Sequence, residues 1–156
     1  MSTDNVQDKL DQLLADCMNE LAAHFALLID ATGQVIASKG EYATDHEAAF
    51  GSLVAGDMAA SHAIAHLIGD TCQLICRECK NGRSYLIPVM EEGALFIYTT
   101  HAVTMPQAKA WEERTASALQ EAVIAYQQVN PVAAPFDDEE DLGGVFDDAL
   151  DAVWTE

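Results

Sequence analysis

The spacing of hydrophobic residues changes several times along the chain, and each change marks a different secondary-structure element. Between residues 4 and 22 hydrophobic side chains recur every three or four positions, which predicts an amphipathic helix. Two short apolar runs follow at residues 24–30 and 34–39, separated by a three-residue turn that contains glycine. Because so short a turn places two strands side by side, we expect an antiparallel hairpin.

The same change of spacing recurs further along the chain. Residues 44–68 are rich in alanine and predict a long second helix, followed by a glycine of the kind that often ends helices. Short apolar runs at residues 71–79, 84–90 and 93–100 predict three strands, and an Asn-Gly dipeptide suited to a tight hairpin joins the first two. Residues 105–129 return to helical spacing and predict the last helix.

This order of elements predicts the fold class. Two hairpins and no obligatory parallel crossover favour an antiparallel sheet. We therefore expect an α+β domain over residues 4–129, with a five-stranded antiparallel sheet between helices.

The chain changes composition after residue 129. Residues 130–141 predict an acidic linker, and the spacing of hydrophobic residues in 142–154 predicts a short amphipathic helix. Because so short a helix is unstable alone in water, we expect it to dock into a groove of the protein's own dimer or of a partner. A disordered, solubilising tail is the alternative. The side chains expected to make the contact are Leu142, Phe146, Leu150, Val153 and Trp154.

Charge narrows the choice of partners. The chain has 26 acidic residues against 7 lysines and arginines, a formal net charge of −19. Such a surface repels phosphate backbones and anionic lipids, so we expect a protein partner rather than nucleic acid or a membrane. The first residues lack the layout of a signal peptide, and no apolar run is long enough to span a membrane. We therefore expect a cytoplasmic protein with reduced thiols.

Three cysteines raise the question of a metal centre. Cys72, Cys76 and Cys79 have the C-x3-C-x2-C spacing with which radical S-adenosylmethionine enzymes hold an iron–sulfur cluster. On a strand, however, Cys72 and Cys76 would lie roughly 13 Å apart and Cys79 would point to the other face. Thiolates around one metal must approach to about 4 Å. We therefore expect buried thiols, with Cys79 the most exposed because it lies beside the turn.

Other candidate sites are weaker. His62 and His66 are four residues apart, as helical zinc ligands are, but alanine stands where a zinc protease needs glutamate and no third ligand is placed nearby. We expect surface or interface histidines there. No phosphate-binding glycine loop or nucleophile elbow is present. The sequence thus predicts no catalytic residue, no metal and no cofactor, and a binding protein rather than an enzyme.

The long second helix carries the most informative surface, because successive residues turn by about 100° and sort into faces. One face holds large residues that we expect to lie on the sheet, namely Phe50, Leu53, Val54, Ile64 and Ile68. A second face holds small residues that let another backbone approach closely, namely Ala48, Ser52, Gly56, Ala59 and Ala63. We expect this small face to pair with a second copy in a two-fold dimer. Packing within the same domain, or simple helix propensity, is the alternative.

The remaining side of this helix is weakly polar and poor in charge. It comprises Glu47, Gly51, Ala55, Met58 and His62. We expect these residues to bind another protein.

Four segments together resemble a known family. They read HFALLIDATGQVIAS at 24–38, DHEAAFGSLVAGDMAASHAIAHLIGD at 45–70, CKNGRSYLIPV at 79–89 and ALFIYTTH at 94–101. Over residues 6–126 this pattern resembles the Roadblock/LC7 family, whose bacterial members include MglB-like regulators of Ras-like GTPases.

The resemblance implies a homodimer whose long second helices pair and whose sheets join through the third strand. That strand would bring Cys72, Leu74 and Cys76 to the dimer interface. The resemblance also implies that the paired helices dock a small GTPase, with the protein as a scaffold or as an activator that arranges the catalytic residues of the GTPase. No arginine need be contributed, and none of Arg77, Arg83 and Arg114 is a strong candidate.

Two functional hypotheses follow. The first is a homodimeric adaptor or regulator of a Ras-like small GTPase, in a process such as cell polarity or motility. The alternative is a GTPase-independent polarity or signalling scaffold that acts through the acidic tail helix. A metal or iron–sulfur enzyme is disfavoured by the strand geometry of the cysteines.

Overall fold

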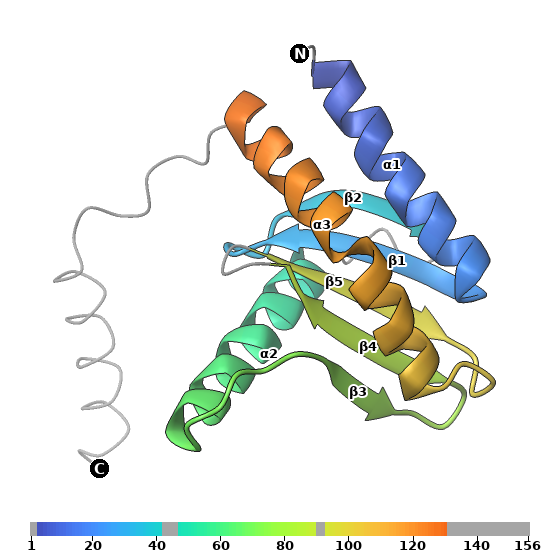
Figure 1. The fold of residues 1–156 in the computed structure, drawn as a ribbon, viewed down its shortest axis with the longest axis vertical. Helices are drawn as coiled ribbons and strands as arrows, with labels where there is room; N and C mark the ends of the chain where they lie inside the picture. Colours follow the sequence, from blue (N-terminus) through green and yellow to red (C-terminus); the bar gives the residue numbers. More distant parts are fainter. Residues whose placement is uncertain (1–2, 42–46, 90–92, 131–156) are drawn as a thin grey trace, which may run out of the picture.

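Helices and strands follow one another in the order that the sequence predicts. The computed structural model describes residues 3–41, 47–89 and 93–130 (Figure 1). Its elements are α1 (Thr3–Glu20), β1 (Ala23–Asp30), β2 (Val35–Gly40), α2 (Glu47–Leu67), β3 (Ile75–Glu78), β4 (Arg83–Pro88), β5 (Gly93–Thr99) and α3 (Met105–Val129). The predicted α+β class is confirmed. Strand β3 is shorter than predicted, because residues 68–74 carry the chain from the end of α2 to the sheet.

The sheet has five strands in the order β2-β1-β5-β4-β3, and every neighbouring pair is antiparallel. The two predicted hairpins, β1–β2 and β3–β4, are therefore joined through β5 in the middle. Among the described strands, β3 pairs with β4 alone, from Ile75 opposite Leu86 to Glu78 opposite Arg83. One edge of β3 has no strand beside it among the described residues.

Helices cover the two faces of the sheet unequally. Of the described helices, α1 and α3 lie next to each other on one face and α2 lies alone on the other (Figure 1). The α1–α3 side holds the larger core, which includes Leu10, Leu14, Tyr85, Trp111 and Leu119. The α2 side holds a smaller cluster. A single helix cannot cover a whole sheet face, so the α2 side retains exposed apolar surface.

The turn between β1 and β2 positions the start of α2. The Asp30 carboxylate accepts hydrogen bonds from the Thr32 amide (2.9 Å), the Thr32 hydroxyl (2.6 Å) and the Gln34 amide (3.0 Å). Gly33 has a φ of +90°, a backbone conformation that residues with a side chain rarely adopt. A Cβ on Gly51 would collide with the Gly33 carbonyl oxygen. The helix therefore packs backbone against backbone on this turn.

Helix α3 begins with a capping box. The Thr104 side chain accepts a hydrogen bond from the Gln107 amide, and the Gln107 side chain accepts one from the Thr104 amide at 2.8 Å. Trp111, Leu119, Ala122 and Val123 are buried, as the helical spacing predicts. None of the helices in the described part of the chain is long and apolar enough to cross a membrane.

Candidate protein-interaction surface

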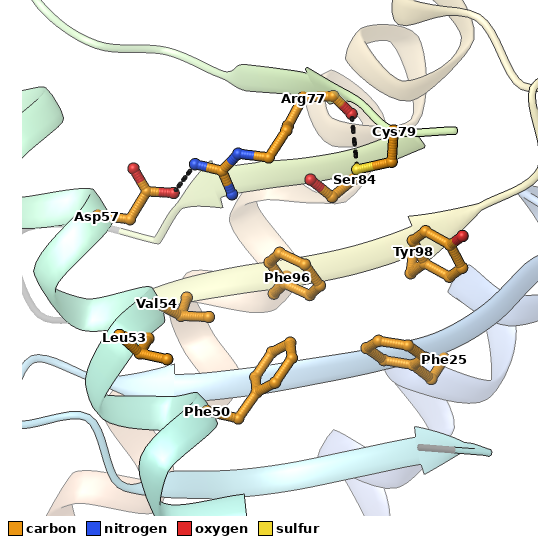
Figure 2. Close-up of a pocket in the computed structure, with 10 residues that line it drawn as sticks. All are labelled: Phe25, Phe50, Leu53, Val54, Asp57, Arg77, Cys79, Ser84, Phe96 and Tyr98. Carbon is orange, nitrogen blue, oxygen red and sulfur yellow. Dashed lines mark hydrogen bonds and ion pairs between the residues drawn. The ribbon is translucent and has the colours of Figure 1, made fainter. Parts of the chain in front are cut away.

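A groove with a volume of about 690 Å³ lies between α2 and the β3–β4 hairpin. Figure 2 shows its floor, where the rings of Phe25, Phe50, Phe96 and Tyr98 lie together. The Phe50 and Phe96 rings meet edge to face, with their centroids 5.1 Å apart. The Phe25 ring stacks on the Phe96 ring and on the Tyr98 ring, with centroid distances of 6.0 Å and 5.6 Å. This floor is preformed, and its apolar rings favour a protein or another apolar occupant.

An ion pair bridges the two walls of the groove. The Arg77 guanidinium on β3 lies 2.7 Å from the Asp57 carboxylate on α2, and Figure 2 shows the side chain reaching across. Both groups are at least partly exposed, so the pair contributes only about 0–1 kcal/mol to folding. The pair links β3 to α2 across the groove.

Beside the groove, α2 and the residue that follows it, Ile68, expose a row of large apolar side chains. The exposed fractions are 74% for Leu53, 61% for Ile64, 84% for Leu67 and 74% for Ile68. Large side chains exposed together in this way mark an interaction surface. The prediction that Leu53, Ile64 and Ile68 lie on the sheet is therefore wrong, although Phe50 and Val54 from the same predicted face do reach it.

A different side of α2 from the one predicted lies on the sheet. Gly51 and Met58 are buried there, together with Val54 and Ala65. The close approach of Gly51 to the β1–β2 turn fixes this orientation. Of the predicted partner-binding side, Gly51 and Met58 are thus buried against the sheet, although Met58 lines a small pocket together with Ala55 and His62. Binding of a partner by this side stays a prediction. The other residues of that predicted side, namely Glu47, Ala55 and His62, are half-buried at its rim.

The predicted small face is exposed at all five positions, Ala48, Ser52, Gly56, Ala59 and Ala63. Apart from the adjoining backbone of α2 itself, nothing in the described residues lies within 4 Å of a Cβ built on Gly56. Ala48 and Ser52 line a second groove with the β1–β2 turn, on the side of α2 away from β3. Since Leu53 and Asp57 line the groove beside β3, the small face and β3 lie on different sides of the helix. Pairing of the small face across a dimer stays a prediction.

Cys76 lies in β3, whereas Cys72 precedes the strand and Cys79 follows it, and all three are half-buried rather than buried as expected. Leu74 and Cys76 pack toward the α1–α3 core, whereas Cys79 lines the groove on the α2 side. Cys72 and Leu74 precede β3, and both are half-buried. Burial and then the nearby Asp57 raise the pKa of the Cys72 thiol. In the described residues no group of three or more His, Cys, Asp and Glu side chains is placed to hold a metal ion.

The aromatic floor of the groove did not emerge from the sequence. Phe25 stands opposite Tyr98, and Leu27 opposite Phe96, in the β1–β5 register. Because side chains alternate along strands, these positions share the α2 face. The sequence signal for this floor would have been the alternation within β1 and β5, which places the aromatic rings of both strands on one face. The predicted tail contacts at Leu142, Phe146, Leu150, Val153 and Trp154 lie outside the described residues and stay predictions.

Comparisons with known proteins agree with this architecture. MglB of Myxococcus xanthus is 20% identical with a TM-score of 0.66, covering 78% of this chain and 96% of that one. The gliding protein MglB of Thermus thermophilus is 24% identical with a TM-score of 0.68, covering 77% and 92%. A structure described as MglB with a tetrameric arrangement is 24% identical with a TM-score of 0.69, covering 78% and 92%. At sequence identities this low, the similarity to these structures shows the fold alone.

The curated proteins contain no match to this chain. A family model does match, and it is described as the Roadblock/LC7 domain and spans residues 9–99. Those residues include the β1–β2 turn, α2, the edge strand β3 and all the residues that line the groove. The chain belongs to the Roadblock/LC7 domain family.

Proposed function

We propose that the protein is a homodimeric adaptor or regulator of a Ras-like small GTPase. The observation that carries the proposal is the exposed apolar row on α2 beside the open edge of β3, in a Roadblock/LC7 domain whose fold matches MglB. Roadblock/LC7 domains are in general binding and regulatory modules. The proposed role is therefore binding, with no active site of the protein's own.

The dimer would use β3 together with the side of α2 that faces it. A second copy related by a two-fold axis can add its own β3 to the open edge, so that main-chain hydrogen bonds continue the sheet. Leu53 and Ile64 of each chain would then be covered by the other chain. Burying such side chains contributes roughly 1.5–3 kcal/mol each.

The GTPase would dock on surfaces of α2 that the second copy leaves open. The small residues Ala48, Ser52 and Gly56 are exposed on the far side of the helix and would let a partner's backbone approach closely. This proposal gives the small face to the GTPase, in place of the dimer pairing that the sequence predicts. The chain as a whole is strongly acidic, which fits a partner with a basic patch.

The test is a binding and hydrolysis measurement with a Ras-like GTPase from the same cells, loaded with GDP or with a non-hydrolysable GTP analogue. We expect a complex with one nucleotide state in preference to the other. A folded dimer that binds neither state rules out the GTPase role.

The acidic tail supports a second candidate, a GTPase-independent scaffold, because its apolar residues recur at helical spacing. Deleting residues 136–156 separates the two functions. If the GTPase role is correct, GTPase binding survives at least in part. If the scaffold role is correct, capture of a non-GTPase partner disappears with the tail.

A further inference from the structure

A polar network centred on His101 anchors the tip of the β3–β4 hairpin. The ring atom Nδ1 lies 2.9 Å from a Glu78 carboxylate oxygen, and Nε2 lies 3.0 Å from the Lys80 carbonyl oxygen. Arg83 donates to the other Glu78 oxygen at 2.7 Å and to the carbonyl oxygens of His101 and Val103 at 2.8 and 2.9 Å. The network joins β3, its turn and β4 to the loop before α3.

The two ring contacts place a hydrogen-bond acceptor beside each ring nitrogen of His101. A backbone carbonyl oxygen and an ionised carboxylate can only accept hydrogen bonds. The pKa of Glu78 is lowered, first by its hydrogen bond from Arg83 and further by His101, which keeps the carboxylate ionised. A neutral imidazole carries one N–H, whereas the imidazolium cation carries two. Only the cation can donate to Glu78 and to the Lys80 carbonyl at once.

The groups around the ring come from every neighbouring segment. Glu78 on β3 is the facing anion, and it is shared with Arg83 on β4. Arg83 is the cation that contacts Glu78, and Lys80 contributes its backbone carbonyl oxygen. Tyr85, below the loop, donates its hydroxyl to the Val103 carbonyl at 2.8 Å. When His101 loses a proton, Glu78 keeps Arg83 but the ring must release one of its two partners.

The hairpin is the part of the fold that this change would affect most. Strand β3 pairs with β4 alone among the described strands, and its four residues end at Glu78. Arg77 and Cys79, on either side of Glu78, form one wall of the aromatic groove. We propose that His101 binds the hairpin as an imidazolium cation and that its proton controls how firmly β3 presents its open edge to a second copy of the chain. The part of this inference that concerns the second copy rests on the proposed function.

The first test follows the ring and the strand in the wild-type protein. Nitrogen-15 NMR of the imidazole should show both ring nitrogens protonated in the folded protein at about pH 5.5. Hydrogen-exchange protection factors for residues 75–83, corrected for intrinsic exchange, should fall about two- to fivefold by about pH 8, the range expected for an exposed charged contact. A His101 ring that is neutral throughout, or protection that does not change with pH, overturns the inference.

Two variants test whether the pH dependence of hairpin protection comes from His101. His101→Gln, which cannot titrate, should make protection of the hairpin independent of pH. His66→Gln removes an exposed histidine in the last turn of α2 and should keep the wild-type dependence. An equal dependence in His101→Gln overturns the inference even if the wild type responds to pH.

Sedimentation measures the dimer separately. We expect the dissociation constant of the wild type to rise about two- to fivefold over the same pH range, and that of His101→Gln to stay constant. If no dimer forms at any pH, the dimer proposal fails, while the NMR and exchange data still decide the role of His101. If a dimer forms and its dissociation constant does not change with pH, the proposed link between His101 and the second copy is wrong.

Discussion

Gly51 has no side chain because α2 lies directly on the β1–β2 turn. A Cβ at this position would collide with the Gly33 carbonyl oxygen, so Gly51→Ala must push the helix away from the sheet. We expect a loss of about 1–3 kcal/mol in the free energy of unfolding, measured by urea denaturation. That loss outweighs the gain in helix propensity, which is at most about 1 kcal/mol.

Gly56 is the matched control on the same helix. Apart from the adjoining backbone of its own helix, no atom of the described residues lies within 4 Å of the position that a Cβ would take there, so Gly56→Ala should raise stability by about 0.5–1 kcal/mol. If Gly51→Ala is as stable as the wild type, the close approach is absent. If Gly56→Ala destabilises instead, its Cβ meets a second chain.

Cys17 illustrates how burial suppresses a reactive group. Its thiol is buried in the α1–α3 core, and burial, with a smaller effect of Glu20, raises its pKa to about 12. Because the thiolate is the reactive form, we expect no alkylation of Cys17 in the folded protein at about pH 8. Cys79, half-buried in the groove, should react under the same conditions.

Mass spectrometry of peptides after iodoacetamide treatment identifies the modified cysteines. Denaturant provides the control, since unfolding must expose Cys17 and allow its alkylation. The raised pKa also means that this burial stabilises the fold below the unfolded thiol pKa and that the contribution is lost as pH rises toward about 12. Modification of Cys17 in the native state would contradict the assignment.

At the scale of elements, spacing predicted every helix and strand but not which face of α2 is buried. The helix has apolar residues on two faces, and periodicity alone cannot choose between them. The choice is made by the contact of Gly51 with Gly33, residues that are far apart in sequence. Large residues were therefore expected on the sheet, whereas Leu53 and Ile64 point outward. The length of β3 was overestimated, because residues 71–74 have a strand-like composition but connect α2 to the strand.

The orientation of α2 leads to a prediction about which side of it joins a second copy. Leu53→Asp places a charge on the exposed side that faces β3, so it should leave the fold intact and shift the protein to monomer by at least about tenfold in dissociation constant. Ser52→Asp is the matched control, because the adjacent residue is exposed on the other side of the helix. Sedimentation velocity measures both, with circular dichroism to verify folding.

The two variants also separate the competing interfaces. If Ser52→Asp dissociates the dimer and Leu53→Asp does not, the small face is the one that pairs. If neither changes the dissociation constant, the dimer does not use α2.

For the whole molecule, charge is the dominant feature. The formal net charge is −19, and residues 131–156 supply nine acidic residues without a lysine or arginine. Two copies brought together therefore repel each other, and the tails contribute much of that repulsion. Removing residues 131–156 changes the formal net charge of each chain from −19 to −10.

We expect the truncated chain, ending at Asn130, to dimerise more tightly than the full chain at low ionic strength. The difference should shrink as salt rises, because at about 1 M salt the screening length falls to about 3 Å. Measuring the dissociation constants of both proteins by sedimentation equilibrium at several salt concentrations tests this. If the tail docks on its own dimer, the opposite result is expected, because deletion would then weaken the dimer at every salt concentration. The weakening should be clearest at high salt, where charge repulsion is screened and the apolar contacts of Phe146 and Trp154 remain.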